Sequence, residues 1–217
     1  MICLGIQTAA QPYSIALVDE TRVLTELTIT ANYEFTESLM ETIDALCKKS
    51  DIIIQKFSCI GVITGPGGYT GLRSGIVTAK TIASVLKKPI YGIPTMEALA
   101  ETMPPLQTVL LCVMKATKRD YNIQMFQRTI EKKEAISDCK VVSVERLNEL
   151  LSQFKKTVYV TGIFDQDLVS SVKNPNVYFH PSSIVAHTCA RLAEEKYQSK
   201  EDSHYPSLRA YYSHSPV

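Results

Sequence analysis

Residues 65–75 have the sequence Gly65-Pro66-Gly67-Gly68-Tyr69-Thr70-Gly71-Leu72-Arg73-Ser74-Gly75. Together with Gly61, this stretch holds six of the nine glycines of the chain. An apolar run over 58–63 precedes the glycines, and a helical pattern over 72–86 follows them. Glycine lets a second backbone or a ligand come close because it has no Cβ. The order strand, glycine loop and helix is typical of α/β proteins, in which phosphates and partner backbones dock at the helix N-terminus.

The glycine loop lacks the residues of the known phosphate-binding motifs. No lysine follows Gly71, as a Walker A loop requires, and Thr70 stands where a dinucleotide fingerprint has its third glycine. A nucleotide at Gly65–Gly71 is therefore the alternative hypothesis, which would make the chain a small ATPase or a sugar-kinase-like enzyme. The other interpretation is a tight turn that packs the following helix closely onto a sheet.

The helix after the loop carries a face of small residues. Gly75, Ala79 and Ala83 recur every four residues, which places them on one side of the helix. Small side chains let another backbone approach closely. The neighbour is either this chain's own core or a helix of another subunit, and the sequence leaves both open.

The glycine stretch resembles the signature G-P-G-S-F-T-G-[LV]-R-x-G of the bacterial TsaB family, also called YeaZ. Three further segments carry the resemblance: 2–9 is similar to the family's I-L-A-I-D-T-S opening, 35–39 to its H-S-E-x-L, and 94–100 to its V-S-[ST]-L-x-A-L-A. The resemblance is strong over residues 1–103 and loose afterwards. Residues 115–122 depart from the family's D-A-R-x-G-E-V-Y, since its Asp and Arg are replaced.

The resemblance implies an α/β protein with the ASKHA fold of actin and sugar kinases, in which two RNase H-like lobes each have a mixed sheet flanked by helices. It also implies a pseudoenzyme without catalytic residues or a cofactor of its own. Such a subunit supports synthesis of threonylcarbamoyladenosine on tRNA (t6A37) by pairing with a catalytic TsaD-like paralogue and a TsaE-like ATPase. It would meet tRNA only through that complex, pair with itself when alone, and leave ADP or ATP to the complex junction.

The resemblance assigns partner binding to the helices predicted over 34–50 and 72–86. Phe35 replaces the family's histidine, whereas Glu37 matches its motif. The partner-binding candidates are Phe35, Glu37, Leu39, Met40, Ile43, Leu72, Arg73, Gly75, Ile76, Ala79 and Ala83, and the glycine-loop candidates are Gly65, Pro66, Gly67, Gly68, Tyr69, Thr70 and Gly71.

Gln7 ends the first predicted strand, where the resemblance places the metal-organising Asp of ATP-hydrolysing ASKHA proteins. A neutral amide cannot supply the negative charge that a metal-bound phosphate site uses. Gln7 therefore indicates loss of ATPase function. The alternative is a buried amide that hydrogen-bonds the neighbouring loop.

The chain divides into two predicted lobes at Met103-Pro104-Pro105. Residues 1–103 form an N-terminal lobe that opens with three antiparallel strands over 2–7, 13–18 and 22–30. Residues 104–217 form a smaller C-terminal lobe with a flexible tail. This second lobe is predicted to have strands over 108–114, 121–126, 129–136, 158–162 and 176–179, and helices over 144–156 and 182–197.

Composition argues against several classes of protein. The formal net charge of +1 does not indicate direct RNA binding, and neither a signal peptide nor an apolar run of ~20 residues for a membrane span is visible. The six cysteines lack C-x-x-C pairs and indicate reduced thiols in the cytoplasm. The four histidines form no H-x-x-x-H, which the catalytic paralogues use for a metal, so we expect no metal site. Without a G-x-S-x-G elbow, a peptidase would have no candidate nucleophile.

Overall fold

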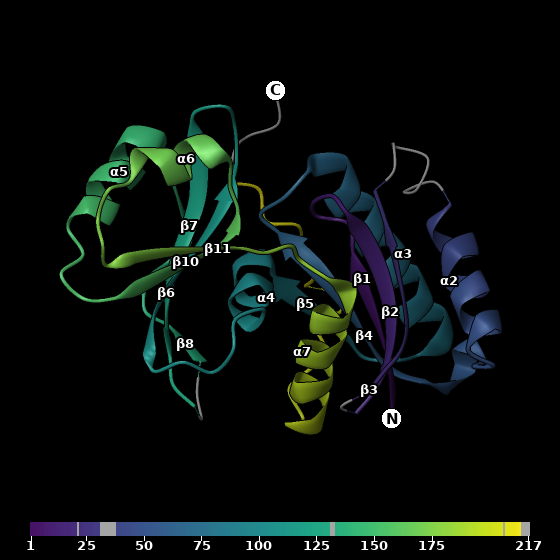
Figure 1. Ribbon diagram of the computed structural model, residues 1–217. Coiled ribbons are helices and arrows are strands. Elements are labelled where there is room, and N and C mark those ends of the chain that lie inside the picture. Colours follow the sequence, from purple (N-terminus) through teal and green to yellow (C-terminus); the bar gives the residue numbers. More distant parts are fainter. Residues whose placement is uncertain (21, 31–37, 131–132, 206, 214–217) are drawn as a thin grey trace. The chain divides into compact units, whose positions relative to one another are not determined.

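The computed structural model of the chain describes residues 1–20, 22–30, 38–130, 133–205 and 207–213. The chain divides into two compact units, each built around its own sheet (Figure 1). Unit 1 comprises Met1–Ala98 and Ile184–Val217, and unit 2 comprises Leu99–Ser183. No helix among the described residues combines the length and the apolar character needed to cross a bilayer. The predicted α/β class is confirmed.

Unit 1 has a five-stranded mixed sheet in the order β3-β2-β1-β4-β5. The strands are β1 (Ile2–Gln7), β2 (Tyr13–Asp19), β3 (Arg22–Ile29), β4 (Phe57–Gly65) and β5 (Ile90–Pro94). The first three run antiparallel to one another, whereas β4 and β5 are parallel to β1. The prediction of three antiparallel strands at the start of the chain is confirmed, and their bounds differ by at most one residue.

Helices cover both faces of this sheet (Figure 1). The helices of this unit are α2 (Leu39–Lys49), the short 3-10 turn η1 (Ile54–Lys56), α3 (Tyr69–Leu86) and α7 (Ala186–Gln198), and α4 (Thr95–Glu101) follows β5 directly. The third helix begins three residues before the predicted start, because Gly68 is extended and the helix opens directly at Tyr69. The chain passes from unit 1 to unit 2 within α4.

The two faces of the sheet carry side chains of different size. On one face, branched side chains of β1 and β4 such as Leu4 and Val62 join a large core cluster with α2 and α3. On the other face, Gly5 and Gly61 lie directly under α7, and a Cβ on either glycine would overlap atoms of that helix. The absence of side chains at these two positions lets the backbone of α7 rest on the strands.

Unit 2 has a six-stranded sheet in which β11-β10-β6-β7-β8 follow one another and β9 also pairs with β7. The strands are β6 (Thr108–Lys115), β7 (Asp120–Arg128), β8 (Lys133–Ala135), β9 (Lys140–Ser143), β10 (Val158–Ile163) and β11 (Val177–Pro181), and the helices are α5 (Val144–Ser152) and α6 (Gln166–Ser171). The core of this unit lies between the sheet and α5 and α6. β9 and α6 were not predicted, because both are too short to show a periodic pattern in the sequence.

The structure divides the chain differently from the predicted lobes 1–103 and 104–217. Unit 2 starts at Leu99, and residues 184–217 return to unit 1 instead of completing the second lobe. The close contacts of Gly5 and Gly61 with α7 explain the return, because this helix covers a face of the first sheet. A helical pattern in the sequence cannot reveal which of two sheets the helix will cover.

The described residues after α7 form a C-terminal strap over 199–205 and 207–213 that contacts unit 1. The backbone N–H of His204 donates to the carbonyl of Ile90, and its Nδ1 accepts from Gly92, each at 2.9 Å. Leu208 is buried against Gly92. The N–H of Tyr211 donates to the carbonyl of Thr64 at 2.8 Å. The strap therefore satisfies the open edge of β5, which would otherwise present unpaired backbone groups.

Candidate functional site

Thr8 and Ala9, directly after β1, contact the backbone of the glycine loop. The N–H of Gly68 donates to the carbonyl of Ala9 at 2.7 Å, and Oγ1 of Thr8 donates to the carbonyl of Gly71 at the same distance. A Cβ on Gly67 would lie 2.6 Å from the carbonyl oxygen of Ala9. A Cβ on Gly71 would overlap the carbonyl oxygen of Thr8. These glycines allow two backbones to meet, which favours the tight-turn interpretation.

The rest of the loop joins neighbouring elements of unit 1. The carbonyl of Pro66 accepts from Oγ1 of Thr95 at 2.7 Å. Gly65 has a φ of 115°, and the carbonyl oxygen of Tyr211 approaches it so closely that a Cβ would overlap it. Thr70, which the sequence analysis assigned to the loop, belongs to the first turn of α3 together with Tyr69.

Gln7 is a buried amide whose hydrogen bonds all stay within unit 1. Its Nε2 lies within bonding distance of the carbonyls of Ala10 (2.9 Å), Pro12 (2.8 Å) and Ile184 (3.1 Å). Its Oε1 accepts from the N–H groups of Ala9 (2.7 Å) and Ala10 (3.2 Å). The amide therefore ties the loop after β1 to the segment that leads into α7. This arrangement agrees with the structural interpretation of Gln7.

The small-residue face of α3 packs inside unit 1. Gly75, Ala79 and Ala83 are buried, and a Cβ on Gly75 would overlap Oγ1 of Thr8. Leu72 and Ile76 are buried with them. The neighbour that these residues approach is therefore the chain's own core, and a second chain cannot reach them at the surface.

The remaining partner-binding candidates differ in exposure. Leu39 and Ile43 on α2 are buried in the same core, whereas Met40 and Arg73 are exposed. Phe35 and Glu37 lie outside the described residues. Of the eleven partner-binding candidates, only Met40 and Arg73 are known to be accessible to a partner in this conformation of the chain.

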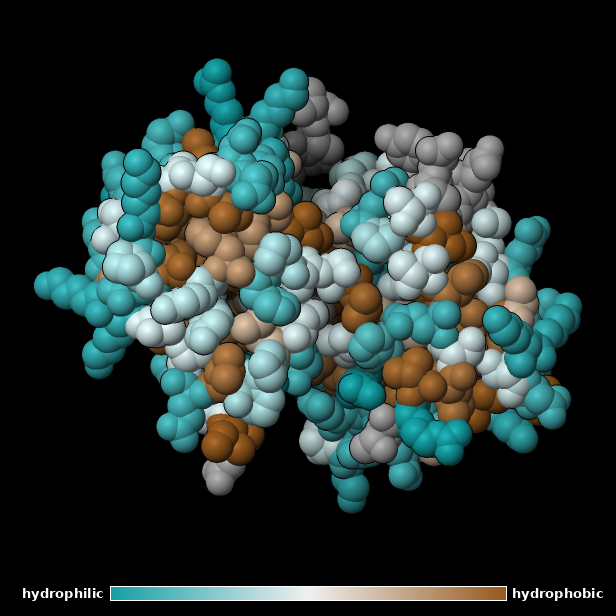
Figure 2. Space-filling model, in the orientation of Figure 1, coloured by the Kyte–Doolittle hydropathy of each residue, from teal (hydrophilic) through white to brown (hydrophobic). Residues whose placement is uncertain are grey.

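Exposed apolar side chains mark a different part of these helices. Met40 on α2, Ile53 before η1, and Val77 and Val85 on α3 are 46%, 59%, 63% and 74% exposed. We call these four residues the outer apolar face. Val77 and Val85 were not among the predicted candidates, because helical periodicity does not show which side of α3 faces the sheet, and Ile53 lies outside both predicted helices. Figure 2 shows that apolar side chains also reach the surface elsewhere, in patches between polar ones.

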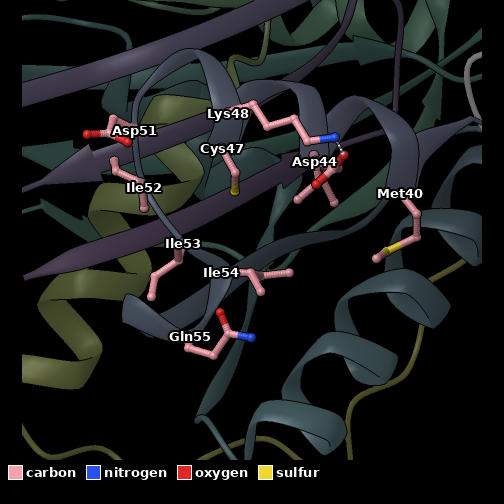
Figure 3. A pocket seen from close by; sticks show the side chains of 10 residues that line it. Met40, Asp44, Cys47, Lys48, Asp51, Ile52, Ile53, Ile54 and Gln55 are labelled. Carbon is pink, nitrogen blue, oxygen red and sulfur yellow. Dashed lines mark ion pairs between the residues drawn. The ribbon is translucent and has the colours of Figure 1, made fainter.

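A pocket of about 510 Å³ lies beside the outer apolar face (Figure 3). One wall comes from α2 and the other from the segment that leads through η1. An ion pair between Lys48 and Asp44 at 2.6 Å lies on the α2 wall. Burial raises the pKa of the Cys47 thiol, so this cysteine is a poor nucleophile. The pocket is lined by Met40, Ile43, Asp44, Cys47, Lys48, Asp51, Ile52, Ile53, Ile54 and Gln55.

Arg73 joins the first turn of α3 to the C-terminal strap. Its guanidinium lies 3.8 Å from the centre of the Tyr69 ring, and its Nε donates to the hydroxyl of Tyr212 at 3.3 Å. The two tyrosine rings are 4.9 Å apart. The strap thus holds the one glycine-loop aromatic residue and the one exposed cation among the predicted α3 candidates.

Lys115, at the start of the divergent segment 115–122, is paired within unit 2. Lys115 pairs with Asp165, whose other carboxylate oxygen accepts from the hydroxyl of Tyr121 at 2.7 Å. The hydrogen bonds from Lys115 and Tyr121 lower the pKa of Asp165 to about 2. Burial and the bond to Asp165 raise the pKa of Tyr121 to about 12. Within the part of the chain that the structure describes, no group of three or more His, Cys, Asp or Glu side chains is placed to hold a metal ion.

Comparison with known families gives a match over most of the chain. Residues 29–203 match the family model described as TsaD, tRNA N6-adenosine threonylcarbamoyltransferase. A curated relative from Bacillus subtilis, the tRNA threonylcarbamoyladenosine biosynthesis protein TsaB, is 35% identical over 100 residues, which are 46% of this chain and 44% of the relative. The protein of the same name from Buchnera aphidicola is 30% identical over 100 residues, 46% of this chain and 47% of its own. The matched part thus spans less than half the length of these relatives.

Solved structures extend the likeness to the whole fold. YeaZ from Pseudomonas aeruginosa superimposes with a TM-score of 0.81 at 17% identity, covering 97% of this chain and 99% of that chain. The ROK hexokinase from Thermus thermophilus superimposes with a TM-score of 0.51 at 11% identity, covering 92% of this chain and all of the other. The predicted ASKHA fold is confirmed.

Proposed function

Because the chain belongs to the family described as TsaD, tRNA N6-adenosine threonylcarbamoyltransferase, we propose that it takes part in threonylcarbamoyladenosine synthesis on tRNA. Its resemblance to the TsaB (YeaZ) members is confirmed by the two named TsaB relatives and the YeaZ fold. The role that we propose is that of a non-catalytic scaffold subunit, which pairs with a TsaD-like catalytic paralogue and works with a TsaE-like ATPase in the cytoplasm. It meets tRNA only through this complex.

The filled glycine loop is the observation that carries the non-catalytic role. The backbone at Thr8 and Ala9 occupies the space that the glycines open, and the amide of Gln7 is fully engaged with backbone groups. A phosphate at this loop would have to displace these contacts, and a metal-bound phosphate would find no carboxylate at Gln7. We therefore propose that any ADP or ATP binds at the junction of the complex and not in this loop alone.

The outer apolar face is the surface that we propose for the partner. A water-soluble chain rarely keeps several large apolar side chains together on neighbouring helices unless they are covered. Val77 and Val85 lie eight residues apart, on one side of α3, so they can contact one apolar helix of a TsaD-like partner. The buried Gly75, Ala79 and Ala83 would then support this surface from beneath, because they let α3 lie close to β1.

Co-purification with the TsaD-like protein of the same genome tests both parts of the proposal. We expect the wild-type chain to be captured, and Val77→Asp and Val85→Asp to lose most of the capture while remaining folded. Ile130→Asp, at a residue that is 70% exposed in unit 2, is the matched control and should be captured normally. Normal capture of both α3 variants would move the interface elsewhere. ATP hydrolysis by the chain alone would contradict the non-catalytic role.

A further inference from the structure

Two buried thiols meet between the central strands of unit 1. Cys3 on β1 and Cys59 on β4 are partners in the parallel register, and their Sγ atoms are 2.6 Å apart. Both side chains are fully buried. They lie on the strand face that α7 covers, since Gly5 and Gly61, two residues further along each strand, contact that helix.

The backbone already has the spacing that a disulfide needs. Neighbouring strands lie about 4.8 Å apart, and disulfides join Cα atoms separated by about 4.4–6.8 Å. The two sulfur atoms face one another, so bond formation requires little movement of either strand. Cys189, which is also buried, is placed differently, because its Sγ lies 3.9 Å from the carbonyl oxygen of Ile6.

We propose that Cys3 and Cys59 form an oxidation site at which a small peroxide converts the two thiols into a disulfide. One thiol, as the thiolate, attacks a peroxide oxygen; the O–O bond breaks, one water leaves, and a sulfenic acid remains. The second thiolate attacks that sulfur, forms the S–S bond and releases a second water. The two thiols are thereby oxidised, and one hydrogen peroxide is reduced to two waters.

Helix α7 covers the two cysteines and thereby controls how fast they react with peroxide. The hydrogen bond with Cys3 and burial raise the pKa of the Cys59 thiol well above its usual range, which leaves little thiolate while the helix is in place. Opening of α7 admits both water and peroxide, so the rate of disulfide formation reports how often this helix lifts from the sheet.

Two glycines provide a matched pair of variants. A Cβ on Gly61 would lie 2.7 Å from both the Ala193 Cβ and the Cys189 carbonyl oxygen, so Gly61→Ala pushes α7 outward. A Cβ on Gly68 would lie 3.5 Å from the carbonyl of Ala9, an ordinary contact, so Gly68→Ala is the control. We expect Gly61→Ala to form the disulfide severalfold faster than the wild type, and Gly68→Ala to match the wild type.

The experiment treats each folded chain with hydrogen peroxide, alkylates the remaining thiols under denaturing conditions and maps the peptides. The expected product is a Cys3–Cys59 linked peptide, which forms in the wild type and disappears in Cys59→Ala. If Gly61→Ala does not fold, the wild type in a urea concentration below its unfolding transition provides the opened state. The proposal is overturned if Cys3 and Cys59 remain fully alkylated under all of these conditions, or if the disulfides found join other cysteines.

Discussion

The helices α3 and α7 pack on opposite faces of the same sheet. Both come close to their neighbours at glycines, which have no side chain. On the α7 face, the glycines belong to the strands, at Gly5 and Gly61, whereas on the α3 face they belong to the helix, at Gly71 and Gly75. The helices differ in what they present outward. Glycines thus mark close packing on both faces, but they do not distinguish an internal contact from a binding surface.

The outward faces of α3 and α7 distinguish a binding surface from a face that stays in water. The exposed positions of α7 include Arg191, Glu195 and Gln198, which suit contact with water. Those of α3 include Val77 and Val85, which do not. An apolar outer face costs free energy as long as it meets water, and this is why we assign the partner surface to α3 rather than to α7.

The largest expected effect comes from breaking the α3 contact. Gly71→Ala places a methyl group onto the carbonyl oxygen of Thr8, a backbone atom that cannot move aside. We expect the free energy of unfolding to fall by about 3 kcal/mol, measured by urea denaturation. Gly68→Ala should change it by less than about 1 kcal/mol, since its methyl group meets an ordinary contact. Equal stability of the two variants would show that the loop can rearrange to accommodate the added methyl group.

A smaller effect is expected from Gln7, whose amide connects the loop after β1 to the segment that leads into α7. Gln7→Leu leaves the carbonyls of Ala10, Pro12 and Ile184 without their shared donor. We expect a loss of about 2 kcal/mol in thermal or urea unfolding, because buried carbonyls lose a hydrogen bond. Gln55→Leu, at an exposed glutamine, is the control and should stay near wild type. An unchanged Tm for Gln7→Leu would show that the hydrogen bonds of Gln7 do not stabilise the fold.

The smallest effect concerns the start of α7, which Glu26 pins to the sheet. The Glu26 carboxylate bonds Nδ1 of His187 at 2.8 Å and its backbone N–H at 3.1 Å. Burial alone would raise the pKa of Glu26, but the hydrogen bonds from His187 outweigh it and the pKa is lowered. The carboxylate therefore stabilises the fold above the unfolded-state pKa of about 4.3, and this contribution is lost as the pH falls through the lower folded value.

Glu26→Gln tests that pH dependence. We expect the variant to be less stable than the wild type by under about 1 kcal/mol at pH 7, and the difference to shrink when unfolding is measured below pH ~4. Glu41→Gln, at an exposed carboxylate of α2, should show neither effect. A difference between Glu26→Gln and wild type that is larger below pH ~4 than at pH 7 would have the wrong sign for a carboxylate whose pKa is lowered in the folded state.

Individual strands and helices were predicted from the sequence more accurately than the contacts that each of them makes. The pattern around the glycine loop predicted β4 and α3 because apolar periodicity and glycine clustering act within one segment. It also singled out Gly75, Ala79 and Ala83 as a close-packing face, and the structure places that face against the chain's own core. Val77 was missed as a candidate, because one turn of helix shows its periodicity but not which side is covered.

By itself, the sequence determined the α/β class, the opening three strands, the strand–loop–helix at 57–86 and the family resemblance, all of which depend on short-range patterns. Only the tertiary structure decided that residues 184–217 return to unit 1, that Gln7 is a structural amide, and that Cys3 meets Cys59. These outcomes depend on pairings between distant segments. Such pairings are chosen by the packing of whole faces, which no local pattern of residues encodes.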